Sequence, residues 1–158
     1  MNYNEYLSHI QAKFSASDDV VIGQQNVRML YEEKFELKWL ATKLKIFSFV
    51  AHAPHITAQD ISLYSDACTT YALNAYKGLP RGFQSGVTSF NVMVSEKVDA
   101  AAVAFAASRP KMRFAAFPMP IIYDLSTMKI FYYQETPMWG AIYYKYLREH
   151  IESNFNIK

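Results

Sequence analysis

Cysteine is nearly absent from the sequence. Cys68 is the only cysteine in 158 residues, which excludes a disulfide within the chain and a zinc module built from several cysteines. Cys68 falls on the core-facing side of an expected helix, so a buried thiol is a better interpretation than a nucleophile. The sequence also has no N-x-S/T motif, and residues 1–11 are polar and amphipathic rather than an apolar signal core. A reducing cytoplasm is therefore the expected location.

Long apolar runs and a strong charge of one sign are missing as well. The longest nearly apolar run, residues 114–123, contains two prolines and is about half as long as a membrane span requires. Lysine and arginine together number 16, and aspartate and glutamate 14, for a net charge of +2. This charge is too close to neutral to predict nucleic acid or an acidic membrane as a partner.

Aromatic side chains, by contrast, are abundant. They make up 16% of the chain, with 12 tyrosines and 11 phenylalanines. Tyrosine suits places where one end of the side chain is dry and the other is wet. The surplus therefore points to an interface or to a pocket lined by aromatic rings.

Hydrophobic periodicity and capping residues divide the chain into expected elements. The clearest helix begins after Thr57, because Asp60 follows it at capping-box spacing. Gly78 supplies a left-handed stop for this helix, and Pro80 prevents its continuation. The expected helices are 3–14, 57–77, 100–108 and 136–153, and the expected strands are 20–22, 27–30, 35–39, 44–53, 87–95, 113–124 and 129–133.

The order of these elements predicts one α/β (α+β) domain over residues 1–158, built on a single mixed sheet. Strands 44–53 and 87–95 should run parallel, joined by a right-handed crossover through helix 57–77. A β-hairpin follows near the C-terminus, and the helices pack on the sheet.

Two strands carry open questions. Pro118 and Pro120 lack N–H donors on the same side of strand 113–124, so that strand should lie at a sheet edge or be bulged there. Residues 35–39 alternate like a strand, but a helix over 33–43 remains an alternative because its residues favour helix.

The segment 78–86, GLPRGFQSG, concentrates three glycines with an arginine and a glutamine. A phosphate cradle normally opens a helix, whereas these glycines close one helix and precede a strand. The pattern favours a structural elbow. The alternative is a ligand loop in which Arg81 and Gln84 present hydrogen-bond donors.

His52 and His55 stand in the sequence HAPH directly after the expected strand 44–53, and Asp60 follows within a turn. Carboxyl ends of strands in α/β sheets are where ligands usually bind. These three residues are weak candidates for acid–base catalysis or for a metal site. A metal would need a further ligand, so ordinary loop histidines are the favoured interpretation, and we expect no metal and no cofactor.

Two patterns of charged residues carry remoter hypotheses. Asp19 with Glu36 and Lys38 is spaced loosely like the acidic residues and lysine of metal-dependent PD-(D/E)xK nucleases. No Pro-Asp pair precedes them, and an alternating strand explains Glu36 and Lys38 equally well.

The second pattern is basic. Arg109, Lys111 and Arg113 alternate, so in an extended backbone they would share one side and form an anion patch with Arg81. A solvated loop is the plainer interpretation.

The C-terminal third departs most from average composition. Residues 130–133 place bulky groups on both faces of a short strand, and the following helix adds more aromatic rings. Either the chain's own helices cover both faces or a second chain covers one. We therefore expect a non-catalytic interaction protein, with a protein partner or a second copy bound through Tyr132, Tyr133, Trp139 and Tyr144. The alternative is a small enzyme or anion-ligand-binding protein that uses the 52–55 loop and Arg81.

Overall fold

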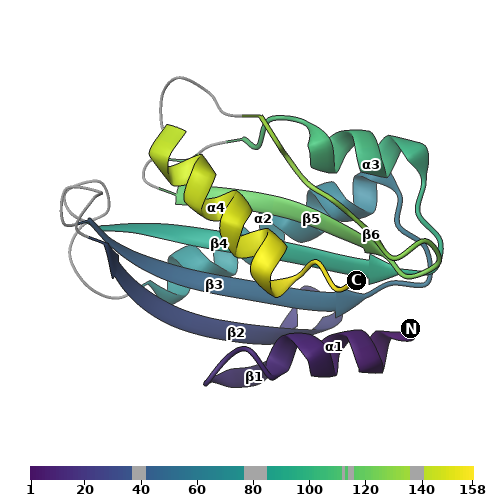
Figure 1. Cartoon of the computed structure of the whole chain (residues 1–158), viewed down its shortest axis with the longest axis horizontal. Helices are drawn as coiled ribbons and strands as arrows, with labels where there is room; N and C mark the ends of the chain where they lie inside the picture. The colour runs from purple at the N-terminus through teal and green to yellow at the C-terminus, as the bar shows by residue number, and fades with distance from the viewer. Residues whose placement is uncertain (37–41, 77–84, 112, 114–115, 136–140) are drawn as a thin grey trace.

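The computed structural model describes residues 1–36, 42–76, 85–111, 113, 116–135 and 141–158. Within these residues a six-stranded mixed sheet carries helices on both faces (Figure 1). The elements are α1 (Tyr3–Gln11), β1 (Ser17–Ile22), β2 (Gln25–Glu36), β3 (Thr42–His52), α2 (Ala58–Ala75), β4 (Ser85–Ser95), α3 (Ala100–Ala107), β5 (Ala116–Asp124), β6 (Lys129–Phe131) and α4 (Ala141–Asn154).

The strands lie in the sheet in the order in which they occur along the chain. β1, β2 and β3 form an antiparallel meander, whereas β3, β4 and β5 run parallel and β6 returns antiparallel to β5. A parallel neighbour requires a crossover, and α2 provides it between β3 and β4. The predicted α/β fold with one mixed sheet is confirmed.

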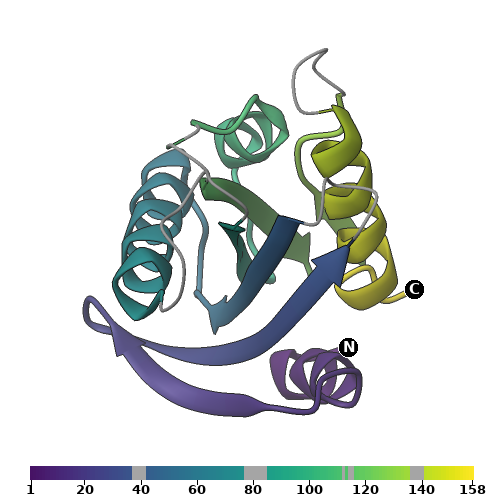
Figure 2. The same ribbon diagram turned by 90° about the vertical axis from the view of Figure 1, so that its left-hand side faces the viewer.

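The sheet has a separate hydrophobic core on each face. Alternate residues of a strand point to opposite faces, so Val92 packs beneath α1 and α4 while its neighbour Met93 packs beneath α2 and α3. Figure 2 shows these two pairs of helices on opposite sides of the strands. Tyr6 of α1 and Leu147 of α4 are fully buried in the first core, and Cys68 of α2 is fully buried in the second.

The capping box predicted for α2 is present. The Thr57 hydroxyl accepts a hydrogen bond from the Asp60 backbone N–H at 3.1 Å. The Asp60 carboxylate accepts in return from the Thr57 backbone N–H at 2.9 Å. These bonds satisfy N–H groups that would otherwise lack partners in the first turn. The helix therefore begins where the sequence predicts.

Several predicted boundaries change. α1 ends at Gln11 rather than at residue 14, and β6 ends at Phe131 rather than at 133. β2 continues as a strand to Glu36, so the alternative helix over 33–43 is wrong at residues 33–36. Residues 37–41, the predicted helix stop at Gly78 and the predicted start of the last helix at Thr136 lie outside the described residues.

The prolines of β5 lie in a strand that is next to the edge rather than at it. Pro118 and Pro120 pair with Ser89 and Asn91 of β4 on one side. On the other side β6 pairs with residues 122–124, beyond both prolines. The expectation of an edge strand is therefore wrong for β5 as a whole, but no described strand needs N–H donors from the prolines on that side.

Candidate functional site

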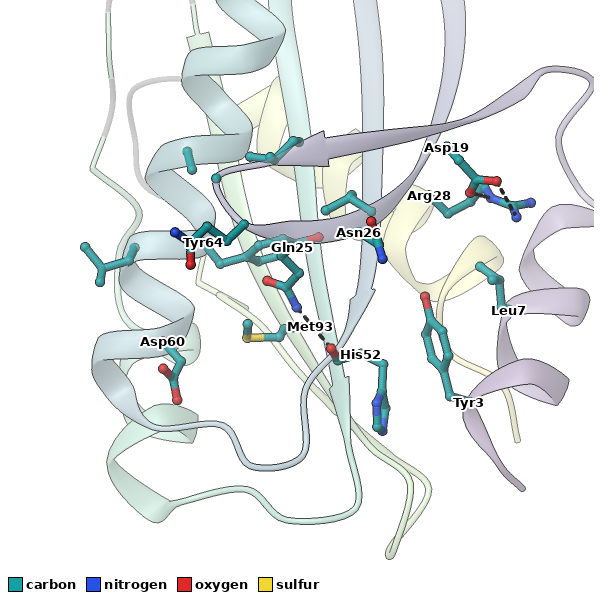
Figure 3. A pocket seen from close by; sticks show the side chains of 16 residues that line it. Tyr3, Leu7, Asp19, Gln25, Asn26, Arg28, His52, Asp60, Tyr64 and Met93 are labelled. Atoms are coloured by element: carbon teal, nitrogen blue, oxygen red, sulfur yellow. Dashed lines mark hydrogen bonds and ion pairs between the residues drawn. The ribbon is translucent and has the colours of Figure 1, made fainter.

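An open cleft of about 920 Å³ lies at the carboxyl ends of β3 and β4, where the tip of the β1–β2 hairpin meets α1 and α2 (Figure 3). We call it the hairpin cleft. Parallel α/β sheets characteristically bind ligands at this end of their strands. The cleft is lined by Tyr3, Leu7, Asp19, Ile22, Gly23, Gln24, Gln25, Asn26, Val27, Arg28, His52, Asp60, Leu63, Tyr64, Ala67 and Met93.

The hairpin tip exists because of a two-residue turn. Ile22 pairs with Gln25, so Gly23 and Gln24 form the turn. Gly23 has φ of +63°, a conformation that glycine adopts at little cost and that suits the first position of a tight hairpin turn. The turn leaves the amide side chains of Gln24, Gln25 and Asn26 beside the cleft.

Tyr3 and His52 form an aromatic wall on the α1 side of the cleft. Their ring centroids lie 5.1 Å apart with 38° between the planes. The Tyr3 hydroxyl reaches the backbone oxygen of Val50 at 3.4 Å, and burial raises the pKa of that hydroxyl. His52 Nε2 lies 3.0 Å from Oε2 of Glu96, and this contact holds the imidazole in place.

An ion pair lies beside this wall. Arg28 donates from Nε to Oδ1 of Asp19 at 2.7 Å and from a terminal nitrogen to Oδ2 at 3.4 Å. The two residues face each other across the β1–β2 pairing. Because the Asp19 side chain is 80% exposed, the pair contributes at most about 1 kcal/mol to stability. Its main consequence is that the positive charge of Arg28 is neutralised within the cleft.

The α2 side of the cleft is mainly apolar, although Asp60 of α2 also lines it. It is formed by Leu63, Tyr64 and Ala67 of α2 together with Ile22 of the hairpin. Behind it, burial raises the pKa of the Cys68 thiol to about 12, so the group stays protonated and unreactive. In Figure 3 the polar side chains Tyr3, Asn26, Arg28 and His52 lie on the α1 side, and Tyr64 lies across the hairpin from them.

The three residues predicted near HAPH do not converge on one centre. His55 Nε2 lies 2.6 Å from Oδ1 of Asp99, so each histidine has its own carboxylate partner. Asp60 lines the cleft, but its carboxylate caps α2. The two loops after β3 and β4 run side by side, joined by a parallel bridge between Ile56 and Val98. Within the described residues no three histidine, cysteine or acidic side chains form a metal-binding group.

The described lining of the cleft offers aromatic rings and side-chain amides. Among its described lining residues there is no serine, threonine, cysteine or lysine. A serine, threonine, cysteine or lysine activated by an adjacent base, a common route to covalent catalysis, is therefore missing from this set.

The pairing of the strands contradicts the nuclease hypothesis, because it separates Asp19 from Glu36. Asp19 lies opposite Arg28, and Glu36 lies opposite Thr42 at the far end of β2. Arg28 and Glu36 are eight residues apart along one strand, which corresponds to about 27 Å. One metal ion cannot bridge such a distance. Lys38 lies outside the described residues.

The predicted anion residues do not join the cleft either. Arg109, Lys111 and Arg113 are exposed near the start of β5, at the opposite end of the sheet from His52. Arg113 donates to the Thr70 hydroxyl at 3.4 Å. Arg81 and Gln84 lie outside the described residues, so a shared patch with Arg81 stays a prediction.

The aromatic residues predicted as an interface are covered by the chain itself. Tyr132 and Tyr133 are each 4% exposed, and Tyr144 is 2% exposed. Tyr132 donates a hydrogen bond to Glu152 of α4, and the rings of Tyr133 and Tyr144 pack edge to face at 5.6 Å. Of the two explanations that the sequence left open for these bulky groups, coverage by the chain's own helix holds for these three. Trp139 lies outside the described residues.

Sequence reasoning missed Tyr3, Asn26, Arg28 and Glu96. The one available signal was the pair of short strands predicted at 20–22 and 27–30, which did not show what the turn between them would contact. Arg28 becomes notable only once it is known to lie opposite Asp19.

No protein-family model matches the chain, and neither the curated proteins nor the solved structures include a significant match. No helix in the described part of the chain is long and apolar enough to cross a bilayer. The function must therefore be inferred from the geometry of the hairpin cleft.

Proposed function

We propose that this protein binds a small polar molecule without negative charge in the hairpin cleft and does not transform it covalently. The observation that carries the proposal is the convergence, at the carboxyl ends of parallel strands, of a fixed aromatic wall and the three amide side chains of residues 24–26. Such a site recognises shape and hydrogen-bonding pattern rather than charge.

The size and lining of the cleft support a small molecule. Ligand pockets typically span about 300–1,000 Å³ and combine apolar walls with a few placed polar groups. The hairpin cleft, at about 920 Å³, lies within this range and has an apolar α2 side and a polar α1 side. A ligand with one apolar face and one polar edge matches this division.

The charges in the cleft oppose an anion. Arg28 is paired with Asp19, and His52 faces Glu96. Asp60 adds a further carboxylate to the lining. No cation among the described lining residues is left without an acidic partner, so a carboxylate or phosphate ligand would meet net negative charge. This weighs against the anion-binding alternative based on the 52–55 loop.

Fragment screening by ¹H–¹⁵N correlation spectra tests the proposal. Neutral polar fragments should shift the backbone signals of residues 23–28 and the side-chain amide of Asn26. Asn26→Ala should weaken those hits at least tenfold, whereas Asn74→Ala, at an exposed position of α2, should leave them unchanged. Hits confined to other surfaces, or equal effects of the two variants, would contradict the proposal.

A protein contact at the rim of the cleft is a second candidate function. Val21 and Leu63 are 66% and 60% exposed, the most exposed large apolar side chains among the described residues, and they stand on the hairpin and on α2 beside the cleft. The sedimentation mass tests for a second copy of the chain at this rim. A dimer that Leu63→Glu dissociates would support this function, and a dimer that the variant leaves intact would place the contact elsewhere. We propose a cytoplasmic location, which the single buried cysteine supports.

A further inference from the structure

Hydrogen bonds within the protein position both rings of the aromatic wall without a ligand. Tyr3 is held through its hydroxyl by Val50, and His52 is held through Nε2 by Glu96. The His52 backbone oxygen also accepts a hydrogen bond from Gln25 Nε2 at 3.0 Å. These bonds are made at ring ends and at the backbone, and the two rings contact each other at 5.1 Å between centroids, so a flat ligand would use the ring faces that are turned away from this contact. The His52 side chain is 35% exposed, so a ligand can reach it.

Beside the wall lies a hydrogen-bonding edge. The side-chain amide of Asn26 is exposed and has no hydrogen-bond partner among the described residues. Figure 3 shows it between Arg28 and His52, above the wall. Gln25 uses its nitrogen on His52, which leaves its oxygen as an acceptor. A primary amide offers one donor and one acceptor side by side, the pattern with which asparagine and glutamine recognise the edges of nucleobases.

The ion pair and the helix cap in the cleft favour a base without a phosphate over a nucleotide. A phosphate needs an uncommitted arginine, lysine or helix N-terminus. In the described lining, Arg28 already donates twice to Asp19, and the carboxylate of Asp60 occupies the first turn of α2. The cleft therefore suits a flat heterocycle that carries no phosphate.

We propose that the ligand of the hairpin cleft is a nucleoside, bound with its base stacked on the Tyr3–His52 wall and its polar edge read by Asn26 and Gln25. A monosaccharide fits less well, because it has no planar ring to stack on the Tyr3–His52 wall. The inference rests on the proposed small-molecule function and names the class of ligand.

Titrations of the 158-residue protein with adenosine, guanosine, cytidine and uridine test this inference, with ribose and the matching 5′-monophosphates as comparison ligands. At least one nucleoside should shift the Asn26 side-chain amide and the ring signals of Tyr3 and His52. Its 5′-monophosphate should bind at least tenfold more weakly, and ribose should cause no shift. Equal or tighter binding of the monophosphate would overturn the inference, as would shifts caused by ribose alone.

Variants separate recognition from folding. Tyr3→Leu keeps an apolar side chain on α1 but removes the ring, and it should weaken nucleoside binding at least tenfold. His9→Leu changes an exposed position of the same helix and should have no effect. Asn26→Ala removes an exposed side chain without a described partner, so it should fold normally and still lose binding. Unchanged affinity in both Tyr3→Leu and Asn26→Ala would refute the inference.

The outcomes also separate this inference from the function on which it rests. If neutral fragments of other chemistry bind in the hairpin cleft and all four nucleosides fail, the nucleoside inference is wrong and the small-molecule function stands. If no compound of either set shifts the signals of residues 23–28, both are wrong.

Discussion

At the scale of single residues, the pairing of two parallel strands determines which acidic residues lie beside the two histidines of HAPH. The backbone pairing of β3 with β4 continues into the loops that follow, where Ala53 donates to Val94 and Ile56 donates to Lys97. Glu96 and Asp99 therefore come level with His52 and His55. Each histidine meets an acidic residue 44 positions later in the chain. A motif that resembles a shared site in sequence is in fact two separate pairs.

The hydrogen bond from His52 lowers the pKa of the Glu96 carboxyl. A carboxyl whose folded pKa lies below its unfolded value, ordinarily about 4.3, stabilises the fold above that value and loses this contribution as pH falls. Since Glu96 is largely exposed, the effect on stability is small. We expect His52→Ala to raise the pKa of Glu96 back towards its ordinary value in a ¹³C carboxyl titration, and His9→Ala to leave it unchanged. An unchanged Glu96 titration in His52→Ala would contradict the pairing.

Cys68 gives a second expectation at this scale. Its side chain is fully buried and lies against the Tyr64 hydroxyl, and burial raises the thiol pKa to about 12. Thiol reagents attack the thiolate, so native protein at pH 8 should remain unlabelled over hours. The same reagent should label one thiol per chain rapidly in concentrated urea. Fast labelling of the native protein would show that the thiol is accessible.

At the scale of elements, α2 depends on its capping box. Thr57→Ala removes the acceptor for the Asp60 N–H and the hydroxyl that donates to the Asp60 carboxylate at 2.8 Å. We expect the free energy of unfolding to fall by about 1 kcal/mol, measured by urea denaturation. Asp66→Ala, at an exposed position of the same helix, should change it by less than about 0.5 kcal/mol. Equal losses of stability in the two variants would mean that the capping box does not stabilise the fold.

Elements with local signals were predictable from the sequence, and elements set by distant contacts were not. The start of α2 depends on two residues three positions apart, Thr57 and Asp60, so the sequence determines it directly. The length of β2 depends on its pairing with β3 as far as Glu36 and Thr42, which no local pattern contains. The order of the helices was therefore right, whereas β2 joins the strand predicted at 27–30 to the start of the one predicted at 35–39, and several ends were wrong.

The residues of the candidate site divide in the same way, into those with a local signal in the sequence and those placed by distant contacts. His52 and Asp60 could be predicted at the carboxyl end of a strand because α/β sheets place ligands there. Tyr3 and Arg28 could not, since they reach the cleft only when α1 and the hairpin pack against β3. The prediction that Tyr132 and Tyr144 form an interface was wrong for a related reason. Composition indicates that these rings must be covered, but it does not show that the chain covers them itself, through Glu152 and α4.

At the scale of the whole molecule, residues 155–158 join the two ends of the chain. Phe155 is fully buried in the core shared by α1 and α4. Its backbone oxygen accepts from the Tyr6 hydroxyl at 2.8 Å, and the backbone oxygen of Ile157 accepts from the Tyr123 hydroxyl at 2.6 Å. The rings of Tyr6 and Tyr123 in turn contact each other at 4.2 Å between centroids. A short C-terminal segment therefore fixes α1 against β5.

Deleting residues 155–158 should consequently destabilise the whole domain rather than only its end. Loss of a buried phenylalanine side chain costs about 3–5 kcal/mol, and each hydroxyl left without an acceptor adds about 1–3 kcal/mol. Phe155→Ala keeps both backbone acceptors, so it should lose less stability in urea denaturation than the deletion does. Deleting Lys158 alone, an exposed residue, should change little. A melting temperature of the longer deletion within about 2 °C of the intact protein would contradict this role. It would show that α1 is held by its own contacts with the sheet, and that the hydrogen bonds from Tyr6 to Phe155 and from Tyr123 to Ile157 contribute little to stability.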